Sequence, residues 1–456
     1  MSSVKIACLG AGSLYFPRAI GDLVVRDDLA GSELSLYDLD AEKTARMAAL
    51  GQRMTAEAGH GTRVTAASEL GEALDGADFI ITSIGGSGAD ISQDVYTSHH
   101  HAADMHIPAR YGIHQVVGDT AGPAGMMMGL RSISPYLEIC RQVERRCPRA
   151  VLLSHSNPMG VLCRAMNKHS RVKVIGICHG VQATIAQAAE MLGVPAAELH
   201  CTWIGTNHYY WILRAAHKGV DVTDKLAAAA ERLGAKGSDN LAHRLSAVYG
   251  YKVGYPGAGH LVEFYSWATR VANQADLPYG LAHDAKGHGF DESRPAPVRS
   301  EPTEETRREF FKGFQEFLDM MKLPAPGHRD HVSEEGIARM ISAIAQGRRE
   351  VFIVNIPNRG AVANLPAEAI IEIEGVTDTL GVRGITVGEC PLVLKGILEK
   401  RLAWQELVVD AAVTGDRRIA LQALMLDEMA IHPDKAQDML DELLEASRDM
   451  LGQFFA

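Results

Sequence analysis

The sequence has neither a surplus of positive charge nor a long apolar run. It contains 45 Lys and Arg against 56 Asp and Glu, which gives a net charge of −11. A chain this acidic lacks the electrostatic footprint of a protein that binds nucleic acid or an anionic membrane surface. No run of about 18 apolar residues occurs, so we expect no membrane-spanning segment. The start, MSSVKIACLGAG, lacks the apolar stretch and cleavage site of a signal peptide.

Cysteines are few and irregularly spaced. Seven of them stand at positions 8, 140, 147, 163, 178, 201 and 390, and no C-x-x-C pair occurs. An odd number without paired spacing argues against a disulfide framework and against a structural zinc module. We therefore expect a reduced, cytoplasmic protein in which most cysteines are small buried apolar residues.

The length and the order of elements indicate two domains. A single core rarely grows beyond about 250–300 residues, and this chain has 456. Strands are expected at 4–9, 34–37, 77–84, 150–153 and 172–177, with helices such as 41–58 and 134–146 between them. This alternation predicts an α/β fold with a Rossmann-like, doubly wound parallel sheet over residues 1–195. Ligands bind such sheets outside the carboxyl ends of the strands.

Helical segments dominate after about residue 195. They are expected at 223–233, 303–321, 333–346 and 405–426, with β-like stretches at 350–356 and 369–373. Residues 272–302 lack periodicity, which is typical of a long loop, either a lid over a site or a surface insertion. We expect residues 196–456 to form a mixed, mainly helical domain for substrate, metal and oligomer contacts.

The first predicted strand ends in a partial dinucleotide-binding motif. Gly10 and Gly12 allow a tight turn and the close approach of a pyrophosphate, with Ser13 following. Tyr15 stands where a third glycine would complete G-x-G-x-x-G. Asp38 ends the second strand, where an acidic residue binds the adenine ribose hydroxyls, and its charge favours NAD over NADP. Asp40 is close enough to share this role.

Four polar segments follow this motif. They are GDTAGP at 118–123, SNPM at 156–159, CHGV at 178–181 and GTNH at 205–208. Any one of them could be an ordinary turn or helix cap. Two of them stand at predicted strand ends of a dinucleotide-type sheet, and this recurrence indicates a functional site.

The combined order of these motifs resembles the NAD-dependent glycosidases of family GH4 and their close relatives. The resemblance continues through YGY at 249–251, GHLVEF at 259–264, NIPNRGA at 355–361 and GDRR at 415–418. It therefore spans nearly the whole chain. Lactate and malate dehydrogenases share the expected fold of the first domain but lack the later motifs.

The resemblance implies hydrolysis by transient oxidation, outside the usual two-carboxylate mechanism. NAD⁺ takes hydride from the sugar C3, a base removes the C2 proton, the C1 oxygen leaves, water adds, and NADH returns the hydride. By motif match, Cys178 and His208 hold a divalent metal, expected to be Mn²⁺, although thiolates prefer softer metals.

The resemblance also implies residues for proton transfer. The base in the family is a tyrosine, and its match here is Tyr251. The stretch that follows is one residue longer than in the relatives, so Tyr249 and Tyr255 remain alternatives. Asp119 and His179 both stand in matching motifs for the general acid. A histidine titrates near neutral pH, whereas Asp119 would need a raised pKa.

Substrate recognition is expected from residues of the same motifs. Asn157 is predicted to bind sugar hydroxyls beside the nicotinamide, and Asn207 and His179 are further predicted contacts. His179 stands where relatives that act on 6-phosphosugars carry Asp or Asn. An unphosphorylated sugar is therefore expected. Gly180 resembles members that act on uronides, so we expect an acidic α-glycoside such as a uronide or a sulfoquinovoside, with an α-galactoside or α-glucoside as the alternative. Arg131 is a candidate cation for the acidic C6 group, as is Lys252.

Two further functions remain open from the sequence. One is a dehydrogenase that releases NADH in each turnover, and the other is a non-catalytic regulator that binds NAD. In each case the partner is a small molecule. A homodimer or homotetramer is the expected assembly.

Overall fold

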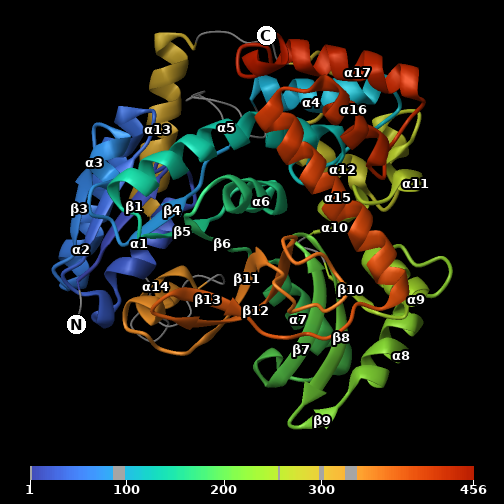
Figure 1. Cartoon of the computed structure of the whole chain (residues 1–456), viewed down its shortest axis with the longest axis horizontal. Helices are drawn as coiled ribbons and strands as arrows, with labels where there is room; N and C mark the ends of the chain where they lie inside the picture. Colours follow the sequence, from blue (N-terminus) through green and yellow to red (C-terminus); the bar gives the residue numbers. More distant parts are fainter. Residues whose placement is uncertain (1–2, 86–97, 255–256, 297–301, 324–335) are drawn as a thin grey trace.

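The structure is a computed structural model that describes residues 3–85, 98–254, 257–296, 302–323 and 336–456 (Figure 1). The strands are β1 (Lys5–Leu9), β2 (Glu33–Tyr37), β3 (Arg63–Ala66), β4 (Phe79–Thr82), β5 (Val151–Ser154), β6 (Lys173–Gly176), β7 (Leu199–Thr206), β8 (Tyr209–His217), β9 (Val220–Asp221), β10 (Lys252–Gly254), β11 (Val351–Pro357), β12 (Ile370–Asp378) and β13 (Gly381–Gly384). The α-helices are α1 (Phe16–Val24), α2 (Ala41–Ala58), α3 (Leu70–Leu74), α4 (His99–Arg110), α5 (Gly122–Arg146), α6 (Met159–His169), α7 (Gly180–Leu192), α8 (Thr223–Leu233), α9 (Leu241–Tyr249), α10 (Ala258–Val262), α11 (Ser266–Thr269), α12 (Leu281–Gly287), α13 (Glu304–Met320), α14 (Ile337–Ala345), α15 (Leu392–Thr414), α16 (Arg417–Leu426) and α17 (Pro433–Ala446). Short 3₁₀ turns are η1 (Asp27–Leu29), η3 (Ala196–Glu198), η4 (Gln274–Asp276) and η5 (Gly452–Phe454).

The larger sheet confirms the predicted fold class. Its strand order is β13-β12-β11-β6-β5-β4-β1-β2-β3, and the run from β6 to β3 is parallel. In chain order this parallel run has the arrangement of a dinucleotide-binding sheet. Successive β1 residues point to opposite faces: Ile6 and Cys8 join one buried cluster, and Ala7 and Leu9 join another. Both faces are therefore covered, as a parallel sheet requires.

The chain after residue 195 returns to this sheet. Strands β11, β12 and β13 extend it beyond β6 in antiparallel fashion, with Asn355 opposite Gly176. The β-like stretches predicted at 350–356 and 369–373 are thus strands of the first sheet. The predicted boundary at 195 falls between α7 and η3, and the division into domains 1–195 and 196–456 stays a prediction.

A smaller antiparallel sheet lies in the second half of the chain, at the lower right of Figure 1. It consists of the β7–β8 hairpin with β10 and β9 at its side. This hairpin and β3 were missed from the sequence. In β7 (LHCTWIGT) the alternation of apolar and polar residues extends only from Leu199 to Trp203, and all residues from Trp203 to Thr206 are buried.

Two helical expectations need correction. The single helix expected at 405–426 is two helices, α15 and α16, because Gly415 takes a positive φ of 69° and ends α15. Residues 272–296 do not form an unstructured loop, since they contain η4 and α12. Leu277, Leu281 and Ala285 recur at four-residue spacing and are buried, so this segment packs as part of the core. Within the described ranges, none of the helices is long and apolar enough to cross a membrane.

Candidate active site

Polar residues meet where the parallel strands end. Asn157 follows β5, and Cys178 follows β6, the next strand in the sheet. Asp119 lies in the loop before α5, and His208 comes from the β7–β8 turn. These four residues are distant along the chain, and the fold brings them close together.

The turn after β1 has the backbone of a dinucleotide-binding loop. Gly10 has a positive φ of 77°, and a β-carbon there would lie 2.2 Å from the carbonyl oxygen of Ser83. Only glycine fits both restrictions. The Ser13 hydroxyl lies 2.9 Å from the Ser83 hydroxyl, which ties the turn to the end of β4. Tyr15 stands before α1, and its hydroxyl lies 2.8 Å from Nε2 of His155.

Asp38 and Asp40 have different local roles. The Asp38 carboxylate accepts the N–H of Gly12 at 2.9 Å and the N–H of Asp40 at 3.0 Å. Asp38 therefore holds the glycine turn against the end of β2. Asp40 caps α2, where its side chain accepts the N–H groups of Glu42 and Lys43. Asp38 is thus the acidic residue at the expected ribose position, and Asp40 acts as a helix cap.

Replacement of Gly12 tests this loop. A β-carbon at Gly12 would lie 2.6 Å from Cδ of Lys43 and 3.1 Å from Oδ2 of Asp38. We expect Gly12→Val to weaken NAD⁺ binding roughly tenfold or more, the factor that about 1.4 kcal/mol of strain produces. Isothermal titration with NAD⁺ measures the effect. Gly396→Val is the control, because nothing lies within 4 Å of its β-carbon position. Unchanged NAD⁺ affinity in Gly12→Val would remove this loop from the cofactor site.

A tight turn presents His208. Thr206 pairs with Tyr209 across the hairpin, so Asn207 and His208 are its two loop residues. His208 has a positive φ of 64°, an uncommon conformation for a residue other than glycine. The turn directs its ring at Cys178, with Nε2 3.5 Å from the cysteine Sγ. This is the metal-ligand pair predicted from the sequence, and the two side chains are in direct contact.

Thr120 sets the orientation of the His208 ring. Its hydroxyl donates to Oδ1 of Asp119 at 2.6 Å and lies 3.1 Å from Nδ1 of His208. A hydroxyl has one hydrogen, and a carboxylate only accepts. The threonine oxygen must therefore accept a hydrogen from Nδ1 of His208. This assignment leaves the Nε2 lone pair facing Cys178.

Asp119 joins the remaining members of the cluster. Its Oδ2 accepts Nδ2 of Asn157 at 2.8 Å, and its Oδ1 lies 3.3 Å from Nε2 of His260. The rings of His208 and His260 are 4.4 Å apart in an edge-to-face arrangement. Asp119, Asn157, Cys178 and His208 thus form one polar cluster together with His260.

The pKa values of the titratable residues in this cluster are shifted in different directions. Burial, reinforced by His260, lowers the pKa of His208 to about 3, so its ring is neutral and can act as a ligand. Burial would raise the pKa of Asp119, but His260, His208 and the Thr120 hydroxyl together hold it well below its usual range. Burial disfavours the charged form of His260, yet the Asp119 carboxylate raises its pKa. Asp119 is therefore the anionic member of the cluster.

The donor set fits a divalent cation. Ligand atoms of Asp119, His208 and His260 all lie within 4.8 Å of one another. A sulfur and a nitrogen bound to one ion at about 2.3 and 2.0 Å are roughly 3.1–3.6 Å apart, and the Cys178–His208 distance of 3.5 Å is in this range. This three-residue group does not include Cys178, whose Sγ contacts it through Nε2 of His208. With that sulfur the donors are sulfur, nitrogen and oxygen atoms, and their chemistry alone does not select Mn²⁺ over a softer metal.

His179 and Asn207 flank the cluster. His179 is exposed at the N-terminus of α7, one residue after Cys178. Asn207 is 2% exposed, and its Nδ2 donates to Oε1 of Glu372 at 3.3 Å. Glu372 also accepts Nδ2 of Asn355 at 2.8 Å, and burial raises its pKa to about 7. Asn207 therefore anchors the His208 turn to β11 and β12.

Arg131 does not occupy the predicted place at the substrate. Its guanidinium is fully buried and forms an ion pair with Asp104 and a 3.0 Å hydrogen bond to the Ser447 hydroxyl. Arg131 therefore ties α5 to α4 and to the segment after α17. Lys252 is likewise buried, with its Nζ 3.3 Å from Oε1 of Gln187 on α7 and 2.7 Å from the carbonyl oxygen of Val253.

Tyr251 lies away from the cluster along the small sheet. It precedes β10, whose Lys252 pairs with Ile212 of β8. Ile212 is four residues from His208, which corresponds to about 13 Å along an extended strand. Within the described part of the chain, Tyr251 makes no hydrogen bond or ring contact to the cluster. Tyr249 packs against Trp211 at 6.0 Å between ring centroids, and Tyr255 lies outside the described residues.

The sequence alone did not identify His260 as a member of the cluster or Thr120 as a hydrogen-bond partner of its members. His260 was noted only as part of GHLVEF, and Thr120 only as part of GDTAGP. Their signal was present, because each stands in a polar motif beside apolar segments. Their proximity to His208 depends on where α10 and the 118–123 loop meet, and no local pattern encodes that distance.

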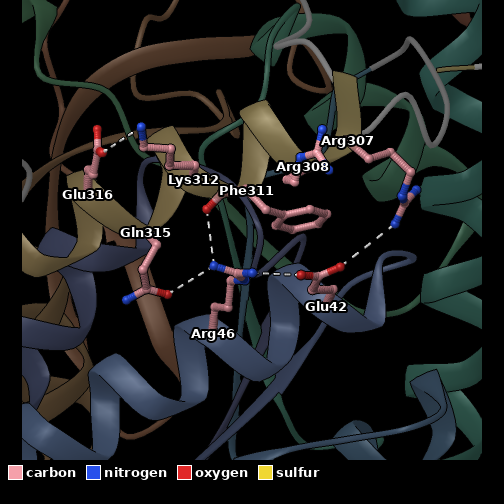
Figure 2. A pocket seen from close by; sticks show the side chains of 8 residues that line it. All are labelled: Glu42, Arg46, Arg307, Arg308, Phe311, Lys312, Gln315 and Glu316. Atoms are coloured by element: carbon pink, nitrogen blue, oxygen red, sulfur yellow. Dashed lines mark hydrogen bonds and ion pairs between the residues drawn. The ribbon is translucent and has the colours of Figure 1, made fainter. Parts of the chain in front are cut away.

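A separate pocket lies between α2 and α13 and has a volume of about 580 Å³. Figure 2 shows Arg46 at its floor, bonded to Glu42, to the carbonyl oxygen of Phe311 and to Gln315. None of its lining residues belongs to the polar cluster. Because Arg46 is already paired there, we assign no ligand to this pocket.

Two family models match the chain. The model described as family 4 glycosyl hydrolase matches residues 5–194, and the family 4 glycosyl hydrolase C-terminal domain matches residues 203–430. An α-galactosidase of Rhizobium meliloti is 29% identical over 100% of this chain and 90% of its own length. An α-galacturonidase of Bacillus subtilis is 29% identical over 98% of both chains.

Solved structures share the fold of this chain. The Bacillus subtilis protein lplD, titled a putative glucosidase, superimposes with a TM-score of 0.80 at 26% identity and covers 97% of this chain and 100% of its own. A 6-phospho-α-glucosidase from gut microorganisms, solved with NAD and Mn²⁺, has a TM-score of 0.76 at 20% identity over 98% and 99% of the two chains. Since the two family models together cover nearly all of the sequence, this protein belongs to family 4 of the glycosyl hydrolases.

Proposed function

We propose that this family 4 enzyme is an NAD-dependent glycosidase that cleaves an unphosphorylated α-glycoside by transient oxidation at C3. The observation that carries this proposal is the contact of Cys178 with His208, which the Thr120 hydroxyl joins to Asp119, beside the carboxyl ends of a dinucleotide-type sheet. Family membership supports NAD as its cofactor and a divalent metal at the cluster.

The cofactor and metal sites have separate residues. Gly10, Gly12 and Ser13 would hold the pyrophosphate and Asp38 the adenine ribose, while Cys178 and His208 would hold the metal. When bound, NAD⁺ supplies reversible hydride transfer and the cation supplies a Lewis acid beside the sugar oxygens. Asn157, already bonded to Asp119, would orient the sugar hydroxyls between these two sites.

The general acid is proposed to be His179. Asp119 carries a lowered pKa and so has no proton to donate near neutral pH. His179 is exposed beside Cys178, where it can reach the leaving oxygen and exchange its proton with solvent. Asp119 would instead orient Asn157 and His260 through its two carboxylate oxygens.

The base at C2 is proposed to be a tyrosine beside β10. This strand runs from Lys252, opposite Ile212, to Gly254, opposite Tyr210, and so it approaches the His208 end of β8. Tyr251, the residue matched by motif, precedes this strand and is the proposed base, with Tyr249 and Tyr255 as the alternatives. A phenol near a bound cation would have a lower pKa than usual, as a base at neutral pH requires.

The substrate is proposed to be acidic at C6, a uronide or a sulfosugar such as a sulfoquinovoside. This proposal rests on Gly180, which resembles relatives that act on uronides, while His179 supports an unphosphorylated sugar. It does not rest on Arg131, whose charge is paired with Asp104. Relatives named α-galacturonidase and α-galactosidase keep both acidic and neutral sugars open. An α-galactoside or α-glucoside is the alternative.

One assay tests the class and the substrate together. The protein is incubated with NAD⁺, Mn²⁺ and aryl α-glycosides of glucuronic acid, galacturonic acid, galactose, glucose and sulfoquinovose. We expect aglycone release in large excess over NADH, with an acidic sugar turned over fastest. One NADH per aglycone would indicate a net dehydrogenase, and NAD⁺ binding without turnover would indicate a regulator.

A further inference from the structure

The loop that carries Asp119 and Thr120 is held by a buried glutamate. Oε1 of Glu263, in the turn after α10, accepts the backbone N–H groups of Val116, Val117 and Gly118 at 2.7, 2.7 and 2.9 Å. Glu263 is fully buried, and its Oε2 has no hydrogen-bond partner among the residues that the structure describes. One carboxylate oxygen thus fixes three consecutive peptide groups.

This arrangement requires a particular backbone. Gly118 has a positive φ of 73°, and a β-carbon there would lie 2.4 Å from Sδ of Met105. Three successive N–H groups converge on one oxygen only where the chain bends in this way. Burial raises the pKa of Glu263 to about 7 despite these N–H groups. Burying a carboxyl group at this position therefore costs folding free energy. A residue needed only to fill space would be apolar.

The fixed backbone affects the proposed metal ligand His208 through Thr120, which lies two residues after Gly118. Thr120 donates to Asp119 and accepts from Nδ1 of His208, which leaves Nε2 facing Cys178. The position of the Thr120 hydroxyl depends on the backbone just before it, at Val116 to Gly118. Glu263 therefore acts on the His208 ring indirectly, through the backbone that positions Thr120.

We infer that Glu263 is a positioning residue which, through the 116–118 backbone and the Thr120 hydroxyl, holds His208 in its metal-binding orientation. Outer residues of this kind fix the tautomer and the direction of a ligand ring. The inference rests on the proposed function only in that the cluster binds a divalent cation. It concerns the hydrogen-bond acceptor of Glu263 and not its charge.

The test measures Mn²⁺ affinity without substrate, by the electron paramagnetic resonance signal of free Mn²⁺. Glu263→Met removes the acceptor at similar length, and Glu263→Gln keeps an oxygen in its place. We expect Glu263→Met to weaken Mn²⁺ binding about 10- to 100-fold, and Glu263→Gln to stay within about threefold of the wild type. NAD⁺ affinity, measured in parallel, should not change in either variant.

Thr120 provides an independent pair of variants. Thr120→Val is isosteric but lacks the hydroxyl, and we expect a 10- to 100-fold loss of Mn²⁺ affinity, with recovery in Thr120→Ser. Because both residues act through the same contacts, the Glu263→Met, Thr120→Val double variant should bind Mn²⁺ only slightly more weakly than the weaker-binding single variant. If the losses of Mn²⁺ binding free energy in the two single variants add fully in the double variant, the two residues do not act through shared contacts. If Glu263→Met does not fold, the inference is decided by Glu263→Gln combined with the Thr120 pair.

Controls separate the inference from the proposed function. Glu292→Gln alters a carboxylate that accepts the N–H of Gln274, away from the cluster, and should leave Mn²⁺ affinity unchanged. A folded Glu263→Met variant with wild-type Mn²⁺ affinity overturns the inference. A Glu263→Gln variant that binds Mn²⁺ as weakly as Glu263→Met also overturns it, because that result would indicate a role for the charge. A wild type that binds Mn²⁺ but hydrolyses no glycoside refutes the proposed function alone. A wild type that does not bind Mn²⁺ overturns both.

Discussion

Cys178→Ser is expected to lower metal-dependent turnover roughly 10³-fold or more, with NAD⁺ affinity unchanged. A serine hydroxyl has nearly the size of the thiol but stays protonated at neutral pH, and a metal ligand must be deprotonated. Loss of the cation removes several kcal/mol of stabilisation from charge that develops on the sugar oxygens, and about 1.4 kcal/mol corresponds to a factor of ten in rate. The measurement is kcat across a Mn²⁺ titration, with NAD⁺ binding followed by calorimetry. His208→Ala should behave in the same way.

Cys201→Ser is the matched control for this result. Cys201 lies on β7 and is 7% exposed, and it contacts none of the cluster residues described above. We expect it to change stability slightly and kcat by less than about threefold, as for a substitution far from the reacting atoms. If chelation and both ligand substitutions leave turnover intact, the metal assignment is wrong.

The second large effect concerns the C2 hydrogen. Elimination after oxidation at C3 removes this hydrogen, and a solvent hydrogen later replaces it, whereas direct displacement at C1 never touches it. In D₂O we therefore expect deuterium at C2 of the released sugar, detected by NMR or mass spectrometry. Exchange of the free sugar under the same conditions is the control. A product without deuterium at C2 would mean that the mechanism proposed here does not operate.

Phenylalanine substitutions identify the base. Each keeps the ring but removes the phenol, and loss of a general base costs about 10²- to 10⁴-fold in kcat. We expect this loss in Tyr251→Phe, the residue matched by motif, and a larger loss in Tyr249→Phe or Tyr255→Phe would assign the base to that residue instead. If Tyr251→Phe is the most impaired variant, the base matched by motif is the correct one.

Local chemistry explains why much of this protein was predictable from its residues. The α/β rhythm of the first half, the glycine turn after β1 and Asp38 at the end of β2 are short-range patterns, since each follows from a strand and the turn that ends it. Cys178 and His208 were predicted by their resemblance to family motifs, and the structure brings them to 3.5 Å. Arg131 was misjudged because proximity in sequence does not determine which partner a buried cation finds, which here is Asp104.

The sequence by itself determined the fold class, the family and most members of the polar cluster, because strand periodicity, turn chemistry and motif order are local properties. Only the tertiary structure decided that β11 to β13 complete the first sheet, that His260 joins Asp119, and that Glu263 fixes the loop before Thr120. It also separated Tyr251 from His208 through the register of β10 on β8. These are contacts between residues tens to hundreds of positions apart, and they are set by how the packed elements meet and not by any pattern within one segment.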